Sequence, residues 1–151
     1  MSAVAHSVRK TQLVLGIVQM LVCCIWGLFG DAVANRKHFL GAHHQFAHNG
    51  ELQLVLALVV PYLALSDTWL RIFNVLLVLG TWSNPLAYAV AAVTDHRSAF
   101  FSGSVDGVGG RICEVLLGGI CLPTAVLALV IALVGAIGYS TNETEKDKKK
   151  K

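Results

Sequence analysis

The chain has 151 residues, of which 55% are apolar and only 14% are charged, whereas about a quarter of the residues in a typical soluble domain carry charge. This composition excludes an ordinary water-soluble core and indicates a single membrane domain. The net charge of +3 does not indicate nucleic-acid binding, because five of the twelve basic residues lie in the last six positions. No basic patch carries interleaved aromatic residues.

Four stretches are long and apolar enough to cross a bilayer as helices, which takes about 20 residues. They cover residues 13–30, 46–66, 68–93 and 112–139. No small-residue cleavage site follows the first stretch, so we expect it to be retained as a helix and not removed as a signal peptide. The second and fourth stretches contain proline, which neighbouring helices of a bundle tolerate. The expected fold is all-α, an integral membrane bundle of four transmembrane helices.

The segments between these stretches differ in length and composition. The connector 31–45 contains three histidines, whereas the connector 95–111 is rich in Gly and Ser and is expected to be flexible. Ser66 and Asp67 make a short turn in which Asp67 can cap the third helix. Residues 140–151 are polar and rich in Lys, and we expect them to form a disordered tail.

The distribution of Lys and Arg predicts the orientation. Eight of these residues lie at the amino end, near the short turn and in the tail, and four lie in the two longer connectors. The positive-inside rule therefore places both termini in the cytoplasm. The membrane would be the endoplasmic reticulum in a eukaryote and the inner membrane in a bacterium.

The third apolar stretch contains polar residues, which in a membrane helix indicate a functional or packing role. These polar and aromatic residues are Thr81, Trp82, Asn84 and Tyr88. Gly80, Asn84 and Tyr88 are spaced four residues apart, so they lie on one face of the helix. Gly80 is expected to leave that face open. Hydrogen bonds between helices are the structural alternative for this set.

The start of the second stretch is also polar, and it enters from the side toward which the third stretch exits. Antiparallel geometry is therefore expected to bring its His43 and Asn49 to the depth of Asn84 and Tyr88. Neutral imidazole is a common metal ligand, and one histidine on a helix can hold a haem iron. A zinc or copper cluster and a solvated loop are the alternatives for the local histidines, which are His38, His43, His44 and His48. The four cysteines are predicted to be small apolar residues.

At these residues the sequence resembles the styrene oxide isomerase family of small membrane proteins. The resemblance runs from about Ala42 to Tyr88, with a similar layout in the other two helices. It rests on the following features in order: Ala42-His43, Asn49-Gly50, Val60-Pro61, Asp67, Arg71, Val78 to Asn84 and Tyr88.

The resemblance implies a homotrimer with haem b bound between adjacent subunits. His43 would be the axial ligand of the iron, and Asn49 and Tyr88 would position an epoxide. In that family ferric haem acts as a Lewis acid on the epoxide oxygen, and the epoxide rearranges to a carbonyl compound. Metal ions stabilise charge that develops on oxygen in this general way.

The sequence departs from the family pattern at two positions. The family has an aspartate where this chain has Gly80, and a glycine where this chain has Thr81. The missing carboxylate is expected to enlarge a substrate pocket that also includes Trp82 and Asn84. His48 and Glu51 are additional candidates for an acid or a base. An epoxide hydrolase or cyclase on the same scaffold is therefore an alternative, as is a non-enzymatic haem-b or structural membrane protein. The expected partners are a hydrophobic epoxide and the lipid bilayer.

Overall fold

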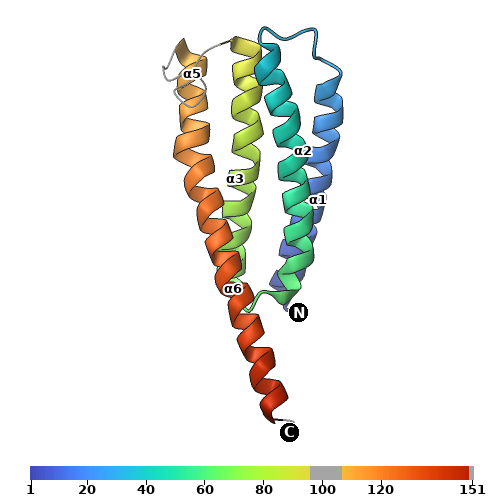
Figure 1. Ribbon diagram of the computed structural model, residues 1–151, viewed down its shortest axis with the longest axis vertical. Helices are drawn as coiled ribbons and strands as arrows, with labels where there is room; N and C mark the ends of the chain where they lie inside the picture. Colours follow the sequence, from blue (N-terminus) through green and yellow to red (C-terminus); the bar gives the residue numbers. More distant parts are fainter. Residues whose placement is uncertain (96–106, 150–151) are drawn as a thin grey trace.

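The computed structural model describes residues 1–95 and 107–149, with side chains described up to residue 139. The described residues are helical and contain no strand. Four long helical rods lie side by side (Figure 1). In chain order their elements are α1 (Ala3–Gly27), α2 (Arg36–Val59), η1 (Val60–Tyr62), α3 (Asp67–Thr94), α5 (Gly107–Glu114), η2 (Val115–Cys121) and α6 (Leu122–Lys149).

Three of the four rods are long and apolar enough to cross a membrane: Ala3–Gly27, Asp67–Thr94 and Gly107–Tyr139. The remaining helix, α2, has 24 residues and at about 1.5 Å per residue would also exceed the thickness of a bilayer core. Its amino half is too polar for it to count as a span by composition. The expected all-α fold is confirmed, and three of the four expected spans are found.

Several helix boundaries differ from the sequence prediction. The helix α1 begins ten residues earlier than expected, with the Ser2 hydroxyl accepting a hydrogen bond from the Ala5 amide at 3.1 Å. Pro61 does not kink a continuing helix but lies in the short turn η1 that ends α2. Ser66, and not Asp67, caps α3.

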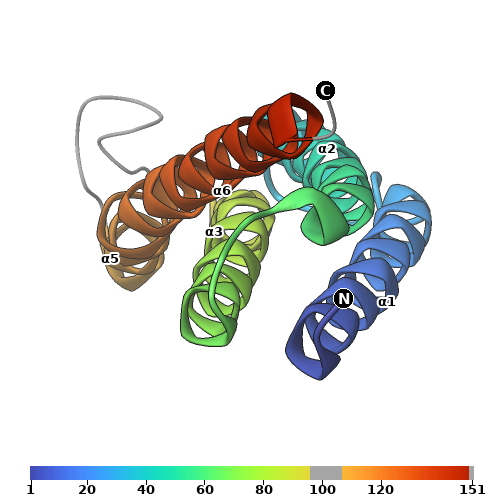
Figure 2. The same cartoon turned by 90° about the horizontal axis from the view of Figure 1, so that it is seen from below.

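The last rod also differs from expectation. It runs from α5 through the π-helical turn η2 into α6, and its backbone helix continues to Lys149 where a disordered tail was expected. The predicted flexible connector lies largely outside the described residues. Seen end-on, α3 lies between the last rod and the α1–α2 pair (Figure 2), and α3 packs against α2 and α6.

Buried glutamines link the helices at mid-bundle. The Gln53 amide donates to Gln19 Oε1 at 2.6 Å, and the Gln19 amide donates to the Thr81 carbonyl oxygen at 2.7 Å. Gln19 and Gln53 are fully buried. The expected interhelical hydrogen bond of Gln19 is therefore confirmed, and it joins α1, α2 and α3 in one polar chain.

Candidate functional site

The histidines that were placed mainly in a connector lie on a helix. The Asn35 side chain accepts a hydrogen bond from the His38 amide at 3.1 Å and caps α2, which begins at Arg36. A side-chain oxygen at this position satisfies an amide that has no partner inside the helix. The solvated-loop interpretation is therefore wrong, and the helix gives each histidine a fixed direction.

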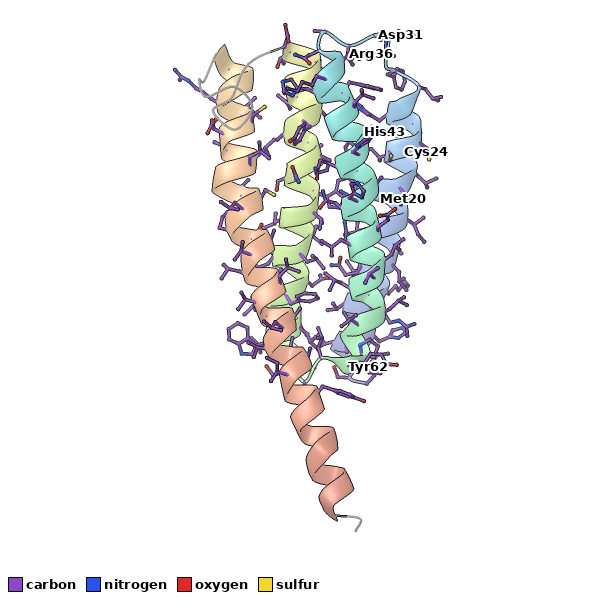
Figure 3. The ribbon with its side chains drawn as sticks, viewed as in Figure 1. Met20, Cys24, Asp31, Arg36, His43 and Tyr62 are labelled. Carbon is purple, nitrogen blue, oxygen red and sulfur yellow. The ribbon has the colours of Figure 1, made fainter. Side chains whose placement is uncertain are left out.

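His43 faces α1. Its Nδ1 lies 3.1 Å from the Cys23 carbonyl oxygen and 3.4 Å from Cys23 Sγ. The Cys23 thiol in turn donates to the His43 carbonyl oxygen at 3.2 Å. On the next turn of α1 a Cβ at Gly27 would lie only 3.3 Å from His43 Cε1, so the glycine gives the imidazole its space. Figure 3 labels His43 on α2 and Cys24, the neighbour of Cys23, on α1.

The bond to Cys23 determines what His43 can do chemically. A carbonyl oxygen only accepts hydrogen bonds, so Nδ1 donates in this contact and the neutral ring keeps the lone pair of Nε2, which lies 3.8 Å from Cys23 Sγ. Metal-binding histidines commonly have this arrangement, in which a backbone carbonyl orients the ring and increases its basicity. His43 therefore fits the donor that a haem iron requires.

No group of three or more His, Cys, Asp or Glu side chains could hold a metal ion in the part of the chain that the structure describes. The zinc or copper cluster considered from the sequence is therefore not formed within these residues. The rings of His43 and His44 are 6.1 Å apart, and those of His44 and His48 are 6.3 Å apart.

The opposite side of α2 carries a cluster of three carboxamides. Gln45 Oε1 accepts hydrogen bonds from the Asn84 amide at 2.8 Å and from the Asn49 amide at 3.3 Å. The Asn49 amide also donates to the Gln45 carbonyl oxygen at 2.9 Å. Gln45 thus fixes which way both asparagine amides point, and it holds them together across the α2–α3 contact.

Tyr88 lies one turn further along α3, directly against the backbone of α2. A Cβ at Gly41 would lie 2.7 Å from Tyr88 Cε1, so only glycine allows the ring to approach this closely. The His38 and Tyr88 rings are 6.3 Å apart. Asn49 and Asn84 therefore meet through Gln45, and Tyr88 lies on the same side of α2 but against Gly41.

The predicted convergence of His43 with these groups is not observed in the structure. His43 and Gln45 are two residues apart, which is about 200° around a helix. Their partners confirm the separation, because His43 contacts α1 whereas Gln45 contacts α3. A single subunit therefore presents the imidazole and the carboxamide cluster on two different sides of α2.

Residues 80–82 were predicted to line a substrate pocket, but in the structure they pack inside the bundle. A Cβ at Gly80 would lie 3.0 Å from the backbone of Ala125, so α6 fills the space that was expected to be open. Thr81 is buried, and its hydroxyl donates to the Leu77 carbonyl oxygen at 2.7 Å. Trp82 packs edge-on against Phe46, with a ring separation of 6.5 Å. Gly80 therefore does not enlarge a pocket in this subunit.

The two additional acid–base candidates lie away from the carboxamide cluster. His48 Nδ1 is 3.5 Å from Glu51 Oε2, and their side chains are 70% and 59% exposed. They pair with each other on the outer face of α2, and neither makes a hydrogen bond to the carboxamides among the described contacts.

Three residues at this site were not singled out from the sequence: Gln45, Cys23 and Gly41. Gln45 could have been found, because it lies four residues before Asn49 on the same helical face. The roles of Cys23 and Gly41 depend on which helices meet, and the local sequence does not encode that information.

Two comparisons with known proteins found matches for this chain. The styrene oxide isomerase family matches residues 8–139. Hydroxylaminobenzene mutase HabA from Ectopseudomonas oleovorans is 33% identical over 78 residues, which are 52% of this chain and 58% of that protein. The chain thus spans little more than half the length of this curated relative. No solved structure matches the chain.

Both descriptions name enzymes that rearrange a single substrate molecule, and together they support a membrane isomerase or mutase. The match covers almost all of the described helices, including both sides of α2. The chain belongs to the styrene oxide isomerase family.

Proposed function

We propose that the chain is a four-span membrane isomerase that opens an epoxide and rearranges it to a carbonyl compound. The observation that carries the proposal is the division of the polar groups between two sides of α2. His43 is held on the α1 side, and Asn49, Asn84 and Tyr88 lie on the α3 side. A site that needs both sets is completed when two copies of the chain meet, which supports a homotrimer with the site between subunits.

The chemistry requires a Lewis acid, and haem b is the group that the family membership suggests. When bound, ferric haem b would supply an acceptor for the electron pair of the epoxide oxygen. His43 would hold it through Nε2, because Nδ1 is engaged by the Cys23 carbonyl oxygen. The Cys23 contact keeps the imidazole in the tautomer that binds a metal.

The groups of the α2–α3 side would bind and orient the substrate oxygen. Tyr88 has a hydroxyl donor, and the Asn84 carboxamide has two N–H donors, only one of which is needed for its bond to Gln45. Gln45 holds Asn49 and Asn84 in place before substrate arrives, so little ordering remains to be done on binding. Each of these groups can stabilise charge on an oxygen without changing its own position.

The apolar surroundings suit an aromatic or otherwise hydrophobic substrate. Trp26 stacks on Phe39 with a ring separation of 5.5 Å and lies 6.4 Å from Phe46, which also contacts Trp82. Exclusion of water protects an electron-poor carbon from hydration while hydrogen migrates within the substrate. The substrate enters from the bilayer, since the surrounding helix surfaces are apolar.

A second candidate function follows from the matched relative, whose name describes a mutase acting on hydroxylaminobenzene. Opening an epoxide breaks a C–O bond, and a hydroxylamine would instead break an N–O bond. Both leave an electron pair on oxygen and an electron-poor centre on the remainder of the molecule. The same oxygen-binding groups would serve either substrate.

Hydration or cyclisation of an epoxide is the remaining enzymatic alternative. It would use His48 or Glu51 to activate water or an internal hydroxyl, but these side chains pair with each other on the exposed face. Incubation of purified protein with an aryl epoxide in ¹⁸O-labelled water separates the outcomes. The proposal predicts a carbonyl compound and no diol, whereas a diol that carries ¹⁸O would indicate a hydrolase. Turnover of hydroxylaminobenzene with no turnover of any epoxide would favour the mutase.

The shared site is tested by mixing two inactive subunits. His43→Ala and Asn49→Ala are each expected to be inactive, because every site lacks one group. In randomly mixed trimers one interface of each mixed trimer combines an intact His43 with an intact Asn49, so about a quarter of the parent activity should return. No recovery in co-expressed and co-purified trimers would contradict a site between subunits.

A further inference from the structure

A groove of about 520 Å³ lies between α1 and α3 at the end of the bundle that carries the amino terminus. The α1 wall includes Ser7 and Val8, and the α3 wall includes Arg71, Asn74 and Val75. It lies toward the opposite end of the bundle from His43 (Figure 3), and thirteen residues of α3 separate Arg71 from Asn84 of the carboxamide cluster. The proposed reaction therefore leaves this groove without a role.

Two polar links between α1 and α3 bracket the groove. Toward the bundle end, the Ser2 hydroxyl donates to the Asp67 carboxylate at 2.7 Å. Toward the middle of the bundle, the Gln12 amide donates to Asn74 Oδ1, also at 2.7 Å. These links hold the two helices at a fixed spacing. Between them α1 presents the small residues Ala3 and Ser7, which leave the groove unfilled.

Arg71 brings to the groove a positive charge that has no ion-pair partner among the described residues. The ion pairs of the described residues are Arg36 with Asp31 and His48 with Glu51, so none of them neutralises Arg71. Asp67 precedes Arg71 by one helical turn, but its carboxylate accepts the Ser2 hydroxyl and makes no ion pair with the guanidinium. An exposed guanidinium beside a hydroxyl and a carboxamide is a suitable receptor for a phosphate group.

The position of the groove indicates where such a phosphate comes from. Arg71 lies in the second turn of α3, at the end of a helix that is apolar enough to cross a membrane. Trp69 is 51% exposed at the same end, as expected at the level of lipid headgroups. Deeper in the groove the walls become apolar, with Val8 and Val75. A cation at headgroup depth above an apolar channel matches a phospholipid better than a free anion.

We propose that this groove binds one anionic phospholipid, with its phosphate on Arg71, Ser7 and Asn74 and an acyl chain along the valines. Binding of a lipid to the folded bundle would tie α1 to α3 and increase its stability by mass action. This role is independent of the reaction proposed above.

The test uses delipidated full-length protein in detergent, titrated with phosphatidylglycerol, phosphatidylcholine or inorganic phosphate and followed by native mass spectrometry and thermal unfolding. Phosphatidylglycerol is expected to bind with one molecule per chain and to raise the Tm, phosphatidylcholine to bind more weakly, and inorganic phosphate to have no effect. Arg71→Gln should weaken phosphatidylglycerol binding by about tenfold, the usual contribution of one charge-assisted hydrogen bond. The matched control Arg36→Gln, which changes a cation at the other end of the bundle, should bind as the parent does.

A second variant tests the groove separately from the charge. Ser7→Leu fills the space between the helices but keeps Arg71, and it should also lose phosphatidylglycerol binding while keeping its helical circular dichroism. Binding at parental affinity by either Arg71→Gln or Ser7→Leu would overturn the proposal. So would equal binding of the two lipids, or a response to inorganic phosphate alone. If one variant does not fold, the other still decides the result.

Discussion

The second and the last helices of this bundle are opposite in character, and α3 packs against both. The helix α2 carries histidines, carboxamides and Glu51, and its composition is too polar for it to be counted as a membrane span. The rod Gly107–Tyr139 is a clear span by composition, and its contact with α3 at Gly80 is a close apposition of backbone and small side chains. The α2–α3 contact contains the polar residues on which the proposed reaction depends, whereas the α3–α6 contact at Gly80 is one of close packing.

Among variants that alter packing and not a proposed catalytic group, the largest effect on activity is expected from Gly41→Ala. The new methyl group would overlap the Tyr88 ring, which lies 2.7 Å from it at Cε1, so the ring must leave its position against α2. We expect at least a tenfold loss of turnover, because the displaced hydroxyl no longer reaches the substrate. Steady-state kinetics with an epoxide checks this. Gly119→Ala is the matched control, since nothing lies within 4 Å of the methyl group there, and a similar loss in both variants would contradict a specific role for the contact.

Gly80→Ala is expected to change stability and not chemistry. Its methyl group would lie 3.0 Å from three atoms of Ala125, and such overpacking typically costs about 1–3 kcal/mol. Thermal unfolding in detergent should show a lower Tm. The double variant Gly80→Ala/Ala125→Gly should recover only part of the loss, because two of the three Ala125 atoms belong to the backbone and remain. A stable Gly80→Ala protein with greatly altered substrate preference would instead indicate that Gly80 lines the substrate pocket.

Gln45→Met should lower turnover several-fold, because the Asn84 amide loses its acceptor and the Asn49 amide keeps only its bond to the Gln45 backbone carbonyl oxygen. Gln45→Glu keeps an acceptor at the same place and should retain more activity. The measurement is kcat and KM for the two variants, together with haem content. Equal effects of Met and Glu, or loss of haem in either variant, would show that Gln45 does not act by orienting the asparagines.

The smallest effect is expected for the double variant His48→Gln/Glu51→Gln. The two side chains form an exposed pair, and exposed pairs contribute little to stability. Activity and Tm should stay close to those of the parent. A large loss of turnover with unchanged Tm would indicate that the catalytic groups lie on the outer face of α2, and it would favour the hydrolase or cyclase.

The sequence predicted the helical membrane fold because long apolar segments have few alternatives in a bilayer. It placed the start of α2 too late, because the polar residues in the amino half of this helix lower its hydropathy. Asn35 was a readable cap signal eleven residues before the expected start. The grouping of Asn49, Asn84 and Tyr88 followed from antiparallel packing.

The roles of Gly80 and His43 could not be read from one-dimensional spacing. A repeat of four residues rotates by about 40° per step on a helix of 3.6 residues per turn. Gly80 therefore faces α6, whereas Tyr88, two such steps further along α3, faces α2. His43 shares a depth with the carboxamides, but depth does not determine which side of α2 a residue occupies.

The central claim is that His43 holds a haem whose chemistry is completed by the carboxamide side of α2. The most direct test is the visible absorption spectrum of protein purified in detergent after haem-supplemented expression, beside His43→Ala and the matched variant His44→Ala. We expect a haem spectrum in the parent and in His44→Ala, because His44 is exposed and bonds to neither α1 nor the carboxamides. The spectrum should be lost or shifted in His43→Ala. A colourless parent, or a parental spectrum in His43→Ala, would contradict the account.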